Sequence, residues 1–267
     1  MAPGQSAGGR QATSGFTMVE LVTVIVILGI LSIGIVRFIG DSSQGFASTI
    51  FRGQLAGDTR FVVERLARDL RNALPNSVRM AGSCLEFVPV SGASRYVTLP
   101  LATPATSFQS VPLDPLPLPA GARVAVYPDA GIYSLGTSGV VSPTVTASAP
   151  GAGNIVTMSF SVAHRFPAAF PADRYFVVTD PVSFCVDGGA LYRYTGYGFF
   201  SAQPAPALLP GGLPDRSPVA EQVVSPTPFQ VSGATLSRNA VVKMDFIFAR
   251  ADDQIRIEHA VQVRNVP

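Results

Sequence analysis

The longest uninterrupted apolar run of the chain lies close to its start. Residues 16–36 read FTMVELVTVIVILGILSIGIV, and Glu20 is the only ionisable side chain among them. A helix rises about 1.5 Å per residue, so a helix of this length spans roughly 32 Å, which is close to the hydrocarbon thickness of a bilayer. The pattern therefore predicts a membrane-spanning helix over residues 16–36.

After Arg37 the apolar positions become periodic. They recur at spacings of three, four or seven residues and form one stripe, while arginines interleaved with aspartates and glutamates occupy the remaining surface. Proline cannot continue a helix, so we expect Pro75 to end it after Leu74. The sequence predicts one long helix with a bend near 40–45, whose amphipathic part lies within 37–77. The stripe consists of Phe51, Leu55, Val62, Leu66, Leu70 and Ala73.

From Val78 onward apolar and polar residues alternate, which is typical of half-buried strands. Two proline-rich stretches, 100–119 and 204–218, are expected to be surface loops, because proline is excluded from central strands. The fold class is therefore α+β, a long N-terminal helix packed on a mostly antiparallel sheet in a β-rich domain over 78–267. Strands are predicted at 85–90, 96–101, 123–127, 155–162, 175–185, 190–197, 239–248 and 254–263, the last pair joined by a turn at Ala251–Asp253 and the last strand carrying Ile255, Ile257, His259, Val261 and Val263 on one face.

Composition and charge narrow the function classes. Hydrophobic residues make up 47% of the chain against 13% charged, which is too apolar for a disordered protein. The 19 basic and 17 acidic residues nearly balance, so no nucleic-acid partner is expected. Cys84 and Cys185 lack the close spacing of a metal or redox site. In an oxidising compartment they are a candidate disulfide, and two separate buried thiols are the alternative.

Catalytic chemistry finds little support in the sequence. His164 and His259 lie in no metal-binding spacing, and no phosphate-binding or nucleophile motif is present. Asp252 and Asp253 are an alternative calcium site, although a solvated hairpin turn explains them more simply. Tyr192, Tyr194 and Tyr197 could bind sugar, although aromatic residues in strands usually serve packing. We predict no catalytic, cofactor-binding or metal-ligating residue, and no enzyme.

The segment before the apolar run and the position of Glu20 set this chain apart from an ordinary signal sequence. Residues 1–15 are small and polar, with Arg10 as the sole charge, and the apolar run is too long for a secretory signal. An uncleaved signal anchor is the alternative, but a carboxylate inside a spanning segment costs about 2.5 to 3.5 kcal/mol at the helix centre. Cleavage between Gly15 and Phe16 would create an amine that pairs with Glu20 of a neighbouring subunit.

The heptapeptide GFTMVEL, followed by the long apolar helix, resembles the type IV prepilin signature. The resemblance implies that residues 1–15 are a leader removed after Gly15 by a prepilin peptidase, that the new Phe16 amine is N-methylated, and that Glu20 docks each subunit. It implies as partners other pilins, the peptidase and an inner-membrane assembly platform. The protein would cross the inner membrane once, with its domain in the periplasm, and later reach a pilus or the cell surface.

A narrower resemblance covers several blocks of the β-rich domain. ALPNSVR at 73–79, CLEF at 84–87, residues 174–199 and the ending HAVQVRNVP are similar to the O-type minor pilins of MSHA-type pili. The implied work is priming or biogenesis of a thin adhesive pilus. A J-like minor pseudopilin of type II secretion and a glycan- or DNA-binding pilin are the alternatives. The long loops favour a minor subunit, because every copy in a close-packed array would have to accommodate them.

Overall fold

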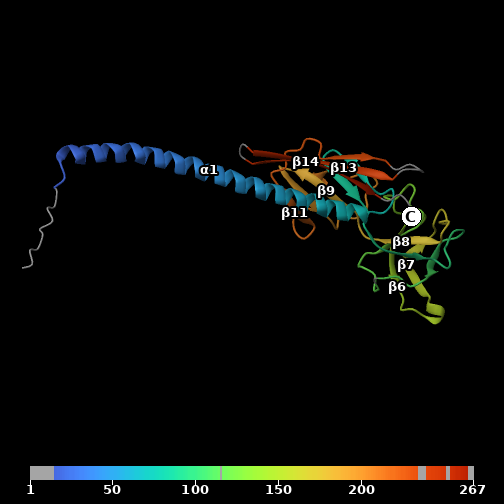
Figure 1. Ribbon diagram of the computed structural model, residues 1–267. Helices are drawn as coiled ribbons and strands as arrows, with labels where there is room; N and C mark the ends of the chain where they lie inside the picture. The colour runs from blue at the N-terminus through green and yellow to red at the C-terminus, as the bar shows by residue number, and fades with distance from the viewer. Residues whose placement is uncertain (1–14, 115, 234–238, 251–252, 264–267) are drawn as a thin grey trace, which may run out of the picture. The chain divides into compact units, whose positions relative to one another are not determined.

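The computed structural model describes residues 15–114, 116–233, 239–250 and 253–263 (Figure 1). The chain divides into two compact units, 1–53 and 54–267. A single helix, α1 (Met18–Arg71), forms the first unit from residue 18 onward. The same helix continues into the second unit as far as Arg71. The predicted leader falls almost wholly on residues 1–14, which lie outside the described residues.

Helix α1 is continuous through residues 40–45, where the sequence predicted a bend, and it ends three residues before the predicted Leu74. The earlier end has a backbone cause. The amides of Asn72 and Ala73 form a tight last turn by donating to Asp69 and Leu70, and the amide of Leu74 donates to the Val88 carbonyl at 2.8 Å. The backbone therefore leaves the helix and pairs with the β-rich domain before the chain reaches Pro75, so the proline is not what ends α1.

The second unit is built around the last turns of α1. Val62, Leu66 and Leu70 are fully buried, as the stripe predicted, and Ala73 is 6% exposed. They share one core with apolar side chains of a five-stranded and a three-stranded sheet. Full burial of a valine or leucine side chain stabilises the fold by about 1.5 to 3 kcal/mol, which fixes this part of α1 in the second unit. The side chains of the other two stripe members, Phe51 and Leu55, lie outside the described residues.

The five-stranded sheet has the order β1-β2-β9-β10-β11. One face of it turns toward α1, and the opposite face carries the two cysteines. Its strands are β1 (Arg79–Ala81), β2 (Cys84–Phe87), β9 (Val182–Asp187), β10 (Ala190–Tyr194) and β11 (Arg216–Glu221).

The three-stranded sheet, β12-β13-β14, completes the core over α1. Strands β13 (Ala240–Arg250) and β14 (Asp253–Val263) pair over their full length without a register shift, which confirms the predicted hairpin. Ile255, Ile257, Val261 and Val263 face the core as predicted, whereas His259 is exposed. Strand β12 (Phe229–Ser232) is short and was not predicted. Two residues of the predicted turn, 251 and 252, lie outside the described residues.

A third, six-stranded sheet is inserted between β2 and β9 and has the order β3-β8-β5-β6-β7-β4. Its two outer strands meet, because Tyr96 just after β3 bridges Ser110 at the end of β4, and the Val111 amide donates to the Arg95 carbonyl at 2.9 Å. The sheet therefore closes on itself around a core of its own. Its strands are β3 (Val90–Arg95), β4 (Ala105–Ser110), β5 (Arg123–Ala125), β6 (Val141–Ala147), β7 (Val156–His164) and β8 (Arg174–Val178).

The strand ladders of the described residues are all antiparallel, so the predicted α+β class is confirmed. Several predicted strands need correction. Residues 96–101 contribute one bridge instead of a strand, and the predicted strand 175–185 divides into β8 and β9, which belong to different sheets. Strand β4 lies inside the stretch 100–119 that was predicted to be loop, and β1, β3, β6, β11 and β12 were not predicted.

Candidate functional site

The predicted processing junction lies in irregular backbone just ahead of α1. Gly15, Phe16 and Thr17 have no regular secondary structure, and the helix begins at Met18. Phe16 is 71% exposed. A protease needs an accessible, extended peptide bond, and the backbone on both sides of the bond between Gly15 and Phe16 is outside the helical hydrogen-bond ladder. The geometry is therefore compatible with cleavage at this bond.

Thr17 and Glu20 form the N-terminal cap of α1. The Glu20 amide donates to Thr17 Oγ1 at 3.3 Å, and the Leu21 amide donates to the Thr17 carbonyl at 3.1 Å. Thr17 Oγ1 in turn lies 3.5 Å from Glu20 Oε2. The Thr17 hydroxyl thus caps the Glu20 amide as in one half of a Thr-x-x-Glu capping box, and the Glu20 carboxylate lies at the positive end of the helix dipole. The sequence reasoning missed Thr17, although the threonine three positions before the glutamate was the available signal.

The rest of the helix before Gly40 presents apolar side chains to its surroundings. The segment Met18–Gly40 has a mean hydropathy of 2.7, and none of it is buried within the chain. Its hydroxyl groups are satisfied internally, since Ser32 Oγ donates to the Leu28 carbonyl at 2.7 Å and Thr23 Oγ1 lies 2.9 Å from the Glu20 carbonyl. Such a surface is stable only in lipid or against other apolar helices. Arg37 lies near the end of this segment, and between Met18 and Val36 Glu20 is the one ionisable side chain.

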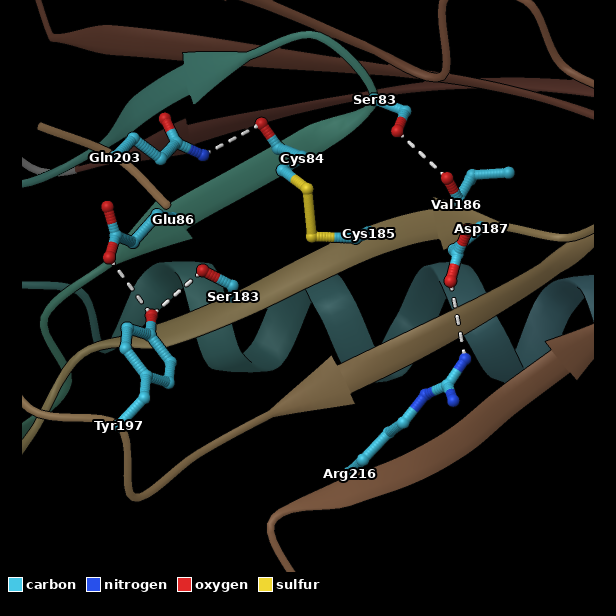
Figure 2. Close-up of a disulfide and its surroundings, with 10 residues drawn as sticks. All are labelled: Ser83, Cys84, Glu86, Ser183, Cys185, Val186, Asp187, Tyr197, Gln203 and Arg216. Atoms are coloured by element: carbon cyan, nitrogen blue, oxygen red, sulfur yellow. Dashed lines mark hydrogen bonds and ion pairs between the residues drawn. A yellow bond between two sulfur atoms is a disulfide. The ribbon is translucent and has the colours of Figure 1, made fainter. Parts of the chain in front are cut away.

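The two cysteines occupy directly opposite positions on β2 and β9 and form a disulfide (Figure 2). Their Cα atoms are 4.1 Å apart, and both residues are buried. Ser83 Oγ donates to the Val186 carbonyl at 2.8 Å beside the bridge, and Gln203 Nε2 donates to the Cys84 carbonyl at 3.1 Å. Because β2 and β9 flank the inserted six-stranded sheet in the sequence, the disulfide joins the two ends of that insertion.

On the same face of the five-stranded sheet, Glu86 is buried and has charged and neutral partners. It forms an ion pair with Arg79. It also accepts a hydrogen bond from the Tyr197 hydroxyl at 3.0 Å, as Figure 2 shows. The Tyr197 hydroxyl also lies 2.8 Å from Ser183 Oγ. Burial, with the nearby Glu86 charge, raises the pKa of Tyr197 far above its ordinary value, so this phenol stays neutral and serves as a donor. The Arg79 guanidinium covers the Tyr133 ring at 3.5 Å, which ties a loop of the insertion to this cluster.

The three tyrosines considered as a sugar platform are engaged within the fold. Tyr194 is 1% exposed, and Tyr192 is covered by the Arg216 guanidinium, 3.7 Å from its ring centre. Tyr197 donates to Glu86, as described above. Because a sugar-binding platform needs open aromatic faces, these residues serve packing in this structure.

The histidines occupy two different environments. His164 is buried, with Nδ1 3.2 Å from the Gly136 carbonyl and Nε2 3.0 Å from the Gly139 carbonyl. Burial lowers the pKa of His164, although both carbonyls favour the protonated form. His259 is exposed on β14. In the described ranges no group of three or more His, Cys, Asp or Glu side chains is placed to hold a metal, and Asp252 of the alternative calcium site lies outside those ranges.

The chain combines an exposed apolar helix, with Glu20 near its start, and an antiparallel domain that contains a disulfide. This combination defines an α+β pilin-like class of protein. Residues 10–36 match the family described as "Prokaryotic N-terminal methylation motif". The match supports a type IV prepilin-like protein that is cleaved by a prepilin peptidase and assembles with other pilins. Proteins of this type are structural subunits. No curated protein and no solved structure matches the chain.

Proposed function

We propose that this protein is a minor pilin-like subunit that assembles into, or primes, an MSHA-type pilus. The observation that carries the proposal is the methylation motif at residues 10–36, which coincides with the irregular junction and the exposed apolar helix. In this proposal the peptidase cuts between Gly15 and Phe16, and the Phe16 amine is methylated. Residues 16–36 anchor the chain in the inner membrane before assembly, and the second unit lies in the periplasm.

Glu20 has an assembly role in this proposal. Among the described residues, the hydrogen-bond partner of its carboxylate is the neutral Thr17 hydroxyl. The surrounding side chains of the helix are apolar and exposed, as in a segment that lies in lipid. A carboxylate in that environment is costly unless a cation is near. The amine that cleavage creates at Phe16 of a neighbouring subunit is such a cation, so the Glu20 charge favours packing of one N-terminal helix beside another.

The size and construction of the second unit support a minor subunit. The closed six-stranded sheet is an insertion of about ninety residues that adds bulk beyond the sheet packed on α1. A subunit repeated along a close-packed filament would have to accommodate this bulk at each step, whereas a rare subunit would not. Of the four blocks that resemble O-type minor pilins, 73–79 follows α1, 84–87 is β2, and 174–199 covers β8, β9 and β10, of which β8 belongs to the inserted sheet. Strands β2, β9 and β10 belong to the sheet packed on α1, so the resemblance supports a shared scaffold that leaves out most of the insertion.

Quantitative mass spectrometry of sheared filaments tests the proposal. We expect the protein in the filament fraction, far scarcer than the main pilin, and we expect pilus number to fall when its gene is deleted. Abundance equal to or greater than that of the main pilin would overturn the minor role. Intact pili combined with a loss of protein secretion would instead identify a J-like minor pseudopilin of type II secretion.

A further inference from the structure

The strand edges of this domain are shielded in different ways, with one exception. In the five-stranded sheet, β1 is only three residues long, and β11 carries Pro218 and a register shift opposite β10. In the six-stranded sheet, the outer strands meet through the bridge between Tyr96 and Ser110. In the three-stranded sheet, β12 is four residues long. Proline, bulges, short strands and closure are the usual means by which proteins prevent unwanted strand pairing. The remaining edge is that of β14.

The hydrogen bonds of β13 determine which backbone groups of β14 face outward. The amides of Asp245 and Ala249 donate to the Pro228 and Gln222 carbonyls, on the side of β13 away from β14. The backbone N–H and C=O groups of the odd-numbered residues of β13 therefore point away from β14, and those of its even-numbered residues point toward it. The continuous register pairs Met244 with His259, so the odd-numbered residues of β14 bond to β13. The even-numbered residues therefore direct their N–H and C=O groups to the open edge. These residues are Gln254, Arg256, Glu258, Ala260 and Gln262, and all five are exposed.

The side chains along this edge do little to repel a partner strand. Arg256 and Glu258 neutralise each other at 2.9 Å, and Arg256 also binds Asp245 with two hydrogen bonds. The other three edge residues are uncharged, and β14 contains neither proline nor lysine. A hollow of about 270 Å³ lies next to the edge, lined in part by Lys243, Asp245 and Arg256, and could receive a polar side chain. In the part of the chain that the structure describes, no backbone hydrogen bond from another segment reaches the five edge residues.

We propose that the open edge of β14 is a docking strand for an extended strand of another pilin-like subunit. This inference rests on the proposed function, because assembly brings such subunits against this domain. The outward amides and carbonyls specify the occupant, since only an extended backbone can satisfy five alternating pairs of donors and acceptors along an edge. The partner strand extends the three-stranded sheet and places alternate side chains beside the hollow.

A proline substitution tests the edge without disturbing the fold. The Ala260 amide faces outward, and proline is tolerated where a strand N–H faces solvent, so Ala260→Pro should unfold like the wild type. It removes one outward donor and places a ring in the path of the partner. We expect the full chain carrying Ala260→Pro to be processed normally but to fall about tenfold in the filament fraction. Ala260→Val, which keeps the amide, is the matched control and should assemble normally.

Hydrogen exchange on the wild-type chain provides a second measurement that does not depend on a variant. In the detergent-solubilised protein the amides of the five even-numbered residues should exchange quickly and those of the odd-numbered neighbours slowly. In the assembled state both sets should be slow, whereas contact through side chains alone would leave the alternation unchanged.

The outcomes separate this inference from the proposed function. Absence of the wild-type chain from filaments overturns both. Normal incorporation of Ala260→Pro, or unchanged alternation of exchange on assembly, overturns the docking strand and leaves the minor pilin proposal standing. Protection that already appears in the detergent-solubilised protein as its concentration rises would identify a second copy as the occupant, and would also overturn the inference.

Discussion

Removal of the Cys84–Cys185 disulfide should produce a large loss of stability, and the structure allows an estimate of its size. The bridge joins positions separated by 101 residues, and the enclosed segment includes the whole six-stranded sheet. In the chain-entropy description, a loop of this length stabilises the folded state by about 4 to 5 kcal/mol. Spread over the 214-residue second unit, that corresponds to a fall in Tm of about 10 °C.

The variant to test is the double substitution Cys84→Ala with Cys185→Ala in the full chain, solubilised in detergent. Alanine leaves no unpaired polar group in this buried site, so the difference reports the cross-link more cleanly than serine would. Urea unfolding followed by circular dichroism, with and without reductant for the wild type, gives the free energy of unfolding. A loss below about 1 kcal/mol, or two free thiols titrated in denaturant without reductant, would refute the reasoning.

Three further predictions concern single side chains. Arg79→Met should lower the free energy of unfolding by about 3 to 5 kcal/mol because it leaves Glu86 buried beside a neutral donor, and a urea midpoint equal to that of the wild type would contradict this. Because burial holds the pKa of His164 below its unfolded value of 6.5, protonation favours unfolding, so stability should fall as pH drops through 6.5 and level off below the folded pKa. His164→Gln should flatten that part of the pH profile, and an unchanged slope would show that other groups cause it. Glu20→Ala should leave the second unit folded and the chain membrane-inserted, yet reduce its incorporation into filaments about tenfold, and normal incorporation would count against the pairing with the Phe16 amine.

The elements that the sequence predicted best are those whose pattern is set by one continuous core. The stripe of α1 and the alternation of β13 and β14 both face the core of the second unit, so periodicity alone located them. The disulfide partners were also the only two cysteines present. The position of Glu20 near the start of α1 followed from its place four residues after Phe16, at the beginning of the apolar run.

The insertion was harder to predict because its strands do not follow simple alternation. Strands β8 and β9 were predicted as one strand because apolar residues flank the segment 179–181 closely on both sides. That segment reads Thr-Asp-Pro, which is typical of a turn, and the chain passes there from one sheet to another. Strand β6 contains Pro143, which is accommodated where its pairing with β5 shifts register and where Ser142 Oγ accepts the Val124 amide at 2.9 Å. The buried ion pair between Arg79 and Glu86 could not be predicted from the sequence, because the residues that cover it, Tyr133 and Tyr197, come from distant loops.

Mass spectrometry of the N-terminus is the most direct test of the proposal that this protein is a processed pilin-like subunit. The protein should be extracted from membranes and from sheared filaments of cells that carry a prepilin peptidase. The N-terminal peptide should then begin at Phe16 and carry a methyl group on its amine. An intact segment from Met1 to Gly15 in both fractions would contradict the proposal.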